Sequence, residues 1–207
     1  MFISFEGIDF SGKSTQVKLL ENYLKDQNKK VKLIREPGGT EISEKIRKIL
    51  LDKENNHMVM ETEIFLFSAS RAQLVREVIR PSLEKGYYVI SDRFHDSSTA
   101  YQGYGRGLPV DSIVKINNLA IGNTVPDITF FIDIPNEVAI ARKAQRSMSD
   151  LDRIEVSDKN FFERVRNGYL KIAESEKRFR VIDGTKSIEE INEMIINEIN
   201  ILEGVNK

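Results

Sequence analysis

A glycine-rich stretch near the N-terminus has the residue types and spacing of a phosphate-binding loop. Residues 7–14 read Gly-Ile-Asp-Phe-Ser-Gly-Lys-Ser, the G-x-x-x-x-G-K-S pattern of a P-loop. Gly7 and Gly12 let the backbone turn so that several N–H groups point toward one anion. Lys13 is placed to reach the β- and γ-phosphates of a nucleoside triphosphate, and Ser14 to bind Mg²⁺. We therefore predict a phosphate site; the alternative is a glycine turn that only leads into a helix.

Charge or glycine recurs where predicted strands end. The four strand ends are Glu6-Gly7, the Arg-Glu-Pro-Gly-Gly run at 35–39, Asp92-Arg93 and Asp133. In open parallel sheets, ligands bind at the carboxyl ends of the strands, and a purely structural sheet needs no repeated charge there. Asp92 is therefore a candidate to hold Mg²⁺ through water, as strand-end aspartates do in P-loop enzymes. The alternative for a single strand-end aspartate is a solvated cap.

A third set of charged residues lies at about 142–157. Arg142, Arg146 and Arg153 stand in or beside the polar run Ser-Met-Ser-Asp at 147–150. From the residues alone, a solvated loop with surface arginines is the simpler interpretation. The alternative is a lid that brings cations to a bound nucleotide.

Strands and helices must position these side chains. The apolar runs at 1–5, 31–35, 87–91, 128–133 and 179–183 predict five strands. Helices are expected directly after the P-loop, at about 41–52, 61–79, 109–121 and 160–177, after Pro135, and after Ser187. Thr40 is expected to cap one helix, and Ser187 with Glu190 to form a capping box for another. We expect the stripe Ile188, Ile191, Ile195 and Leu202 to be core.

Alternating strands and helices predict an α/β fold, a parallel sheet with helices on both faces. The 207 residues suffice for one such domain, 1–207. A net charge of −1 gives no general attraction to a nucleic acid polymer or an acidic membrane. The absence of cysteine excludes disulfides, a thiolate metal site and a cysteine nucleophile. With no signal peptide and no apolar run of membrane-spanning length, we expect a cytoplasmic protein.

Five motifs in this order and spacing make the chain resemble bacterial thymidylate kinases, from about Phe2 to the last helix. They are Phe5-Glu6-Gly7 leading into the P-loop, Arg-Glu-Pro-Gly-Gly at 35–39, Asp92-Arg93-Phe94, Asp-Ser-Ser-Thr-Ala-Tyr-Gln-Gly at 96–103, and Leu-Asp-Arg-Ile-Glu at 151–155. The second and fourth are far more specific than the P-loop. One departure is Phe94, where the family usually has tyrosine.

The resemblance implies a P-loop NTPase-type three-layer fold and transfer of a phosphoryl group from ATP and Mg²⁺ to dTMP, for dTTP synthesis. A phosphate oxygen is already an anionic acceptor, so no strong general base is needed, and catalysis is positioning and charge neutralisation. The family also suggests a homodimer packed through helices. The residues themselves support a dimer only weakly, through an excess of apolar side chains on the helix at 61–79: Phe65, Leu66, Leu74 and Val78.

For dTMP, the resemblance implies that Phe67 stacks on thymine and Arg71 bonds the base edge. Spaced four apart, the two share a helix face, although the residues alone favour core packing for Phe67. Polar contacts to the base are implied for Ser98 and Gln102, and Tyr101 is implied to crowd the sugar 2′ position. The remaining implied substrate residues are Arg35, Glu36, Pro37 and Arg93 beside the acceptor phosphate, Arg47, which could instead be a surface residue, and Asp9, near the 3′ hydroxyl or the metal.

For ATP, the implied binding residues are Gly7, Asp9, Phe10, Ser11, Gly12, Lys13, Ser14 and Thr15. Some members of the family carry a catalytic arginine where this chain has Phe10, and others bring arginine from the lid. This chain belongs with the second group, so the resemblance favours the lid interpretation. The expected catalytic residues are Lys13, Arg93, Arg142 and Arg146, with Arg146 favoured as the partner of the γ-phosphate and Arg153 anchoring the lid through a carboxylate.

Two other classes of protein stay open as alternatives. Another nucleoside monophosphate kinase or a deoxynucleoside kinase would keep the P-loop and lid arginines but should lack the run at 101–103. A regulatory GTPase switch should carry Asn-Lys-x-Asp, and the nearest match, Asn-Lys-Lys-Val at 28–31, lacks the aspartate. A non-catalytic binding module is least favoured, because Lys13, Ser14 and Asp92 are all present.

Overall fold

The computed structural model describes residues 1–145, 147 and 151–204. Its centre is one sheet of five parallel strands in the order β2-β3-β1-β4-β5. The strands are β1 (Phe2–Glu6), β2 (Val31–Arg35), β3 (Tyr88–Asp92), β4 (Ile128–Asp133) and β5 (Phe179–Asp183). The predicted α/β class, strand number and parallel pairing are confirmed.

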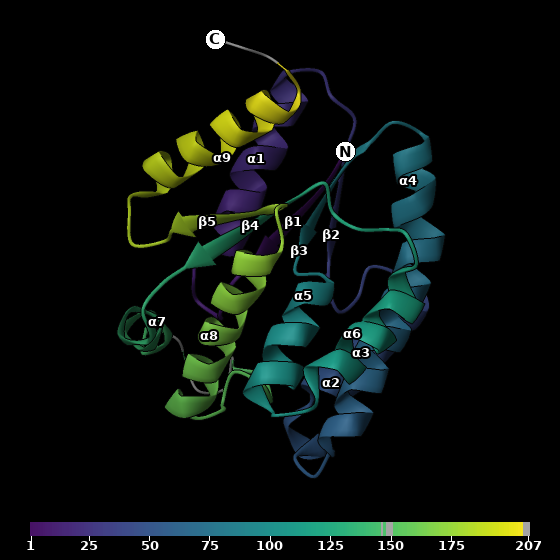
Figure 1. Ribbon diagram of the computed structural model, residues 1–207, viewed down its shortest axis with the longest axis vertical. Helices are drawn as coiled ribbons and strands as arrows, with labels where there is room; N and C mark the ends of the chain where they lie inside the picture. The colour runs from purple at the N-terminus through teal and green to yellow at the C-terminus, as the bar shows by residue number, and fades with distance from the viewer. Residues whose placement is uncertain (146, 148–150, 205–207) are drawn as a thin grey trace.

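Helices cover both faces of this sheet (Figure 1). They are α1 (Lys13–Asp26), α2 (Glu41–Leu51), α3 (Met60–Leu74), α4 (Arg80–Glu84), α5 (His95–Ser98), α6 (Val110–Ile121), α7 (Asn136–Lys143), α8 (Lys159–Ser175) and α9 (Ile188–Leu202), with a short 3₁₀ turn, η1 (Lys53–Asn55). π-helical segments η2 (Val75–Ile79) and η3 (Thr99–Gly105) continue α3 and α5. Among the described residues, none of these helices has the length and apolar character needed to cross a bilayer.

Side chains of the central strand β1 point alternately to the two faces of the sheet and so contribute to two separate core clusters. Ile3 and Phe5 of β1 pack with the apolar sides of α1 and α9. Phe2 points the other way, into the cluster formed with α3, η2 and α6. Because side chains alternate between the two faces along a strand, Glu6 points to the same face as Phe2. Its carboxylate therefore lies on the side of the sheet covered by α5 and α8.

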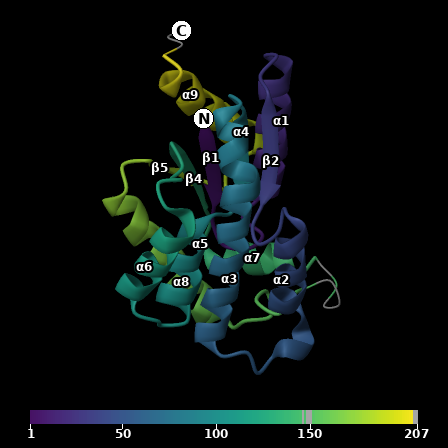
Figure 2. The same cartoon turned by 90° about the vertical axis from the view of Figure 1, so that its right-hand side faces the viewer.

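Two predicted helix starts are confirmed in detail, a third predicted helix is confirmed with a change of helix type, and the predicted core stripe of the last helix was wrong in part. The Thr40 hydroxyl accepts the Ser43 N–H at 3.1 Å, and Ser187 and Glu190 form a capping box. The helix predicted at 61–79 is regular only to Leu74 and then widens into η2, although Figure 2 shows α3 and α4 as one long column. In α9, Ile191 and Ile195 are core, but Ile188 and Leu202 are 51% and 43% exposed, and the buried Ile199 takes the place expected for Leu202.

The helical stretch at 95–105 was not predicted. Gly103, Gly105 and the β-branched Thr99 lower intrinsic helix propensity, so tertiary packing must hold it. A Cβ atom on Gly105 would lie 2.7 Å from side-chain atoms of Phe161 and Val165, which shows how closely α8 approaches η3. Glycine at this position is therefore what permits the contact that stabilises the segment.

Candidate functional site

One cavity of about 600 Å³ opens at the carboxyl ends of β1, β2 and β3. Its wall combines the P-loop, the turn after β2, part of α3, the segment after β3 and the 142–155 region. Every described site residue named from the sequence lines it except Gly7, which contributes through its backbone: Asp9, Phe10, Ser11, Gly12, Lys13, Ser14, Thr15, Arg35, Glu36, Pro37, Arg47, Phe67, Arg71, Asp92, Arg93, Ser98, Tyr101, Gln102 and Arg142. Arg146 lies outside the described residues.

The P-loop runs from β1 into α1 in the conformation its glycines allow. Gly7 has φ +146°, and a Cβ there would lie 2.6 Å from the Ile132 carbonyl oxygen. Lys13 begins α1, and its Nζ donates to the Gly7 and Ile8 carbonyls at 3.1 and 2.9 Å. The ammonium thus lies across the mouth of the loop, where a phosphate oxygen could replace these carbonyls as acceptor.

Burial is the main cause that lowers the pKa of Lys13, to about 8, and the charge of Arg93 adds to it. The carboxylates Asp92, Asp9 and Glu6 act in the opposite direction. Lys13 therefore remains mostly protonated at neutral pH and is partly stripped of water, which strengthens its attraction for an anion.

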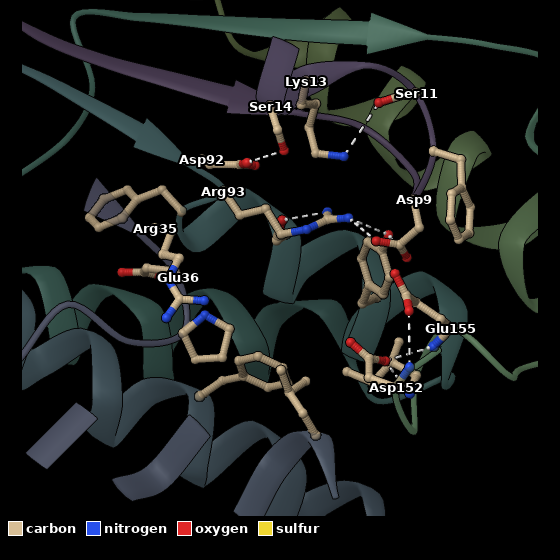
Figure 3. A pocket seen from close by; sticks show the side chains of 18 of the residues that line it. Asp9, Ser11, Lys13, Ser14, Arg35, Glu36, Asp92, Arg93, Asp152 and Glu155 are labelled. Atoms are coloured by element: carbon tan, nitrogen blue, oxygen red, sulfur yellow. Dashed lines mark hydrogen bonds and ion pairs between the residues drawn. The ribbon is translucent and has the colours of Figure 1, made fainter. Parts of the chain in front are cut away.

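The Ser14 hydroxyl and the Asp92 carboxylate face each other at the start of α1 and the end of β3. Ser14 Oγ donates to Asp92 Oδ2 at 2.7 Å, as Figure 3 shows. The described residues contain no group of three or more His, Cys, Asp or Glu that could hold a metal alone. Mg²⁺, however, usually takes one or two protein oxygens plus waters and phosphate oxygens, and this pair fits that pattern.

Arg93 is the most heavily bonded side chain in the cavity. Its Nη1 donates to the Gly7 carbonyl at 2.8 Å, and its Nη2 donates to Asp9 Oδ1 at 2.5 Å and to the Tyr101 hydroxyl at 3.0 Å. Its backbone has φ +70°, a left-handed conformation that is uncommon for arginine. Despite the effect of burial, the pKa of Arg93 is raised and that of Asp9 is lowered, so the two form an ion pair at neutral pH.

Glu6, a charged strand end to which the sequence assigned no specific role, shares the partners Ser97 and Tyr169 with Arg93. Its Oε1 accepts the Phe94 N–H at 2.7 Å, and its Oε2 accepts the Ser97 and Tyr169 hydroxyls at 2.6 and 2.8 Å. Burial is the main cause that raises the pKa of Glu6, to about 7, and the charge of Asp96 adds to it. An acidic residue inside an otherwise apolar strand was the signal available in the sequence.

Arg71 on α3 is almost wholly enclosed, with 1% of its surface exposed. Its Nε donates to Glu36 Oε2 at 2.7 Å, its Nη1 to Ser98 Oγ and Asn117 Oδ1, and its Nη2 to the Phe94 carbonyl. Four of the five guanidinium N–H groups are thereby used, which leaves one of the Nη2 donors for a ligand in the cavity. Burial outweighs Arg71 and raises the pKa of Glu36.

Two further arginines lie near the turn after β2. The half-exposed Arg35 contacts Glu44 at 3.2 Å, and Figure 3 shows it across the cavity from Asp9. Arg47 lines the cavity and donates to the Pro37 carbonyl at 2.8 Å, so it is not a plain surface residue. Burial and the neighbouring Arg35 lower the pKa of Arg47.

Comparisons of the sequence and of the fold with known proteins point to one family. The family model for thymidylate kinase matches residues 5–195. The chain belongs to the thymidylate kinase family. A thymidylate kinase of Thermosipho melanesiensis is 56% identical over 91% of this chain and 92% of the relative, and one of Kosmotoga olearia is 52% identical over 96% and 94%. The crystal structure of thymidylate kinase from Ehrlichia chaffeensis has a TM-score of 0.77 and 36% identity, over 97% of this chain and 98% of that one.

Phe94 is the position where the motif departs from the usual thymidylate kinase pattern. Its ring is fully buried and meets Phe2 edge to face, with ring centroids 4.9 Å apart. Its backbone bonds two site residues, through the N–H bonded to Glu6 and the carbonyl bonded to Arg71. Its ring belongs to the core and also borders the site, because the Arg71 guanidinium lies over it at 5.7 Å from the ring centroid.

The 142–157 segment is held to the rest of the structure at Arg142 and at Arg153. Arg142 donates to the Phe10 carbonyl at 3.0 Å and the Gly184 carbonyl at 3.1 Å, so its guanidinium lies against the P-loop. At the far end, Arg153 pairs with Glu63 at 2.5 Å, which confirms the predicted carboxylate anchor. Since residue 146 is outside the described residues, the expected role of Arg146 as the partner of the γ-phosphate stays a prediction.

Proposed function

We propose that this chain transfers the γ-phosphoryl group of ATP to dTMP, which gives dTDP and ADP and supplies dTTP synthesis. The observation that carries the proposal is one cavity in which a P-loop faces a second, arginine-rich pocket with an aromatic wall. Two phosphate-bearing ligands can meet there end to end. The acceptor oxygen is already anionic, so the arrangement needs positioned cations and no nucleophilic side chain.

ATP is proposed to bind along the P-loop. The residues assigned to it are Gly7, Asp9, Phe10, Ser11, Gly12, Lys13, Ser14 and Thr15. Backbone N–H groups at the start of α1 cradle the phosphates, and Lys13 exchanges its carbonyl partners for phosphate oxygens. Ser14 directly and Asp92 through water are proposed to hold Mg²⁺, which neutralises charge between the β- and γ-phosphates when bound.

dTMP is proposed to occupy the pocket between α3 and η3. Phe67 stacks on the base, and Arg71, Ser98 and Gln102 contact its polar edge. Tyr101 is held by hydrogen bonds to Asp9 and Arg93 and closes the space beside the sugar 2′ carbon. The acceptor phosphate lies among Arg35, Arg47 and Arg93, with Glu36 and Pro37 forming the adjacent wall.

Catalysis is proposed to rest on Lys13, Arg93 and the lid arginines Arg142 and Arg146. Phe10 leaves the P-loop without a guanidinium of its own. Arg142 already lies against the loop carbonyl of that residue, from which it could turn toward a transferring phosphoryl group. Charge spread over three equatorial oxygens would then meet cations from both the P-loop and the 142–157 lid.

We also propose a single kinase domain that works in the cytoplasm as a homodimer. Supporting the dimer, α3 and α6 pack side by side, and both present apolar side chains outward. Phe65 on α3 is 60% exposed and Leu119 on α6 is 80% exposed. A net charge of only −1 gives no general attraction to nucleic acid polymers, which favours small-molecule substrates.

A coupled assay of ADP release tests the activity against a panel of monophosphates: dTMP, dUMP, dCMP, dAMP, dGMP and UMP. We expect dTMP to have the highest kcat/KM, and Lys13→Ala to lower kcat by on the order of 10² or more under the same conditions. A higher kcat/KM with another monophosphate would make this a different monophosphate kinase. If ADP is released at the same rate with and without a monophosphate, the protein is a regulatory NTPase.

A further inference from the structure

Glu63 is a buried carboxylate at the edge of the acceptor pocket that the mechanism above does not use. It lies on α3, one turn before Phe67, and only 1% of its surface is exposed. Three segments converge on it. Gln102 Nε2 donates to its Oε1 at 2.8 Å, Arg106 Nε donates to the same oxygen at 3.3 Å, and Arg153 Nη2 donates to its Oε2 at 2.5 Å.

The charge of Glu63 follows from these partners. Burial alone would raise its pKa, but Arg106 together with the hydrogen bonds from Gln102 and Arg153 outweighs burial and lowers the pKa. Glu63 is therefore ionised at neutral pH. An ionised carboxylate can accept hydrogen bonds but cannot donate them.

This asymmetry decides which way the Gln102 amide points. Only its NH₂ group can face Glu63, so its Oε1 must point away from that carboxylate. Gln102 lines the cavity, and no described residue donates a hydrogen bond to its Oε1. The acceptor pocket therefore presents a carbonyl oxygen from Gln102, and the unused N–H of Arg71 belongs to a residue that lines the same cavity.

One acceptor and one donor in the same cavity match one kind of pyrimidine edge. Thymine offers a carbonyl oxygen at C4 and an N–H at N3, which pair with the Arg71 donor and the Gln102 acceptor. A cytosine ring offers an amino group at C4 and a bare nitrogen at N3, which would set donor against donor and acceptor against acceptor. A site built to satisfy such groups rejects the mismatched analogue strongly.

We propose that Glu63 is a positioning residue for base specificity: by binding the Gln102 NH₂ group, it makes Gln102 an acceptor for the thymine N3–H and excludes 4-amino pyrimidines. The proposal rests on the function proposed above. It assigns to Glu63 no contact with substrate. Its action passes entirely through Gln102.

The test compares dTMP with 5-methyl-dCMP, which keeps the 5-methyl group and changes only the 4-substituent and N3. Glu63→Gln removes the obligatory acceptor, so the Gln102 amide can adopt either orientation. We expect the ratio of kcat/KM for the two substrates to fall by about tenfold or more. In a Gln102→Leu background, the same substitution should leave the ratio unchanged, since no amide remains to be oriented.

Arg106→Gln is the matched control. It removes a partner of Glu63 but leaves the bond between Glu63 and Gln102 in place. We expect it to lower stability without changing the ratio. If Arg106→Gln lowers the ratio as much as Glu63→Gln does, the carboxylate acts only by supporting the fold, and the proposal is overturned.

Glu63→Asp covers the case in which Glu63→Gln does not fold. It keeps a negative charge between the two arginines while drawing the carboxylate back from Gln102 by one methylene group. The ratio should fall here as well, and an unchanged ratio in whichever variant folds refutes the proposal. Failure of the proposed function would look different, because the parent enzyme itself would then show no preference for dTMP.

Discussion

Glu6→Gln should change how the stability of the ligand-free protein depends on pH. The parent carboxyl is buried among Phe94 N–H and the hydroxyls of Ser97 and Tyr169, and its pKa is raised to about 7. Glutamine has nearly the shape of the protonated acid. Its oxygen can accept the Phe94 N–H, while its NH₂ group faces hydroxyls that can turn and accept.

The magnitude follows from the difference between the folded and unfolded pKa values. Burial raises the pKa of Glu6 from 4.5 to about 7, so the folded state binds the proton more tightly. The stabilisation is complete below pH 4.5 and is lost as pH rises through 7. At 1.36 kcal/mol per pH unit, the full loss is about 3 kcal/mol, of which about 2–3 kcal/mol falls between pH 5 and 8.

The assay is urea unfolding of parent and variant at intervals from pH 5 to 8, without nucleotide. The free energy of unfolding of Glu6→Gln, relative to the parent, should rise by about 2–3 kcal/mol across this range. Glu21→Gln is the control. Hydrogen bonds from Lys18 and Lys25 lower the pKa of Glu21, so its effect should be constant over the same interval. A difference between Glu6→Gln and parent that does not vary with pH would refute the reasoning.

Three kinetic predictions follow from the proposed function. Lys13→Ala should stay folded by circular dichroism and lose on the order of 10² or more in kcat, and a near-normal rate would remove Lys13 from the mechanism. Tyr101→Ala should relax the preference for dTMP over ribothymidine monophosphate by roughly 1–3 kcal/mol in kcat/KM, whereas an unchanged ratio places that selectivity elsewhere. Arg146→Ala, measured beside Arg142→Ala, should lower kcat by on the order of 10² or more with dTMP affinity nearly intact; parent rates in both variants would mean that another cation serves the transition state.

Local patterns were enough to predict the sheet and the phosphate loop. β2, β4 and β5 begin and end where their apolar runs do, and β1 and β3 differ from prediction by one residue. The central strands β1, β3 and β4 are buried on both faces, and such strands read as near-continuous apolar runs in the sequence. The P-loop could be predicted because its glycines, lysine and serine lie within eight residues of each other.

The contacts that orient the site could not be predicted in this way, because their partners are far apart in the chain. Tyr169 reaches Glu6 across 163 positions, and nothing in α8 marks that tyrosine as part of a site. In the sequence, Glu63 is only one of several acidic residues at the start of α3. The structure shows that Gln102 and Arg153 donate hydrogen bonds to it. The helical turns at 95–105 likewise depend on α8, which follows more than fifty residues later.

The position of β1 in the sheet also bears on how this protein emerges from the ribosome. β1 precedes all other elements, yet its neighbours are β3 and β4, at residues 88–92 and 128–133. One edge of the P-loop strand therefore stays unpaired until β3 has been made and the other until β4 has been made, and Gly7 meets the Ile132 carbonyl only when β4 is in place. A nascent chain that stops before β4 carries the whole phosphate motif but cannot complete the loop, and it exposes an apolar strand edge that invites aggregation. Such a topology favours late, nearly all-or-none assembly of the nucleotide site over early folding of its N-terminal half.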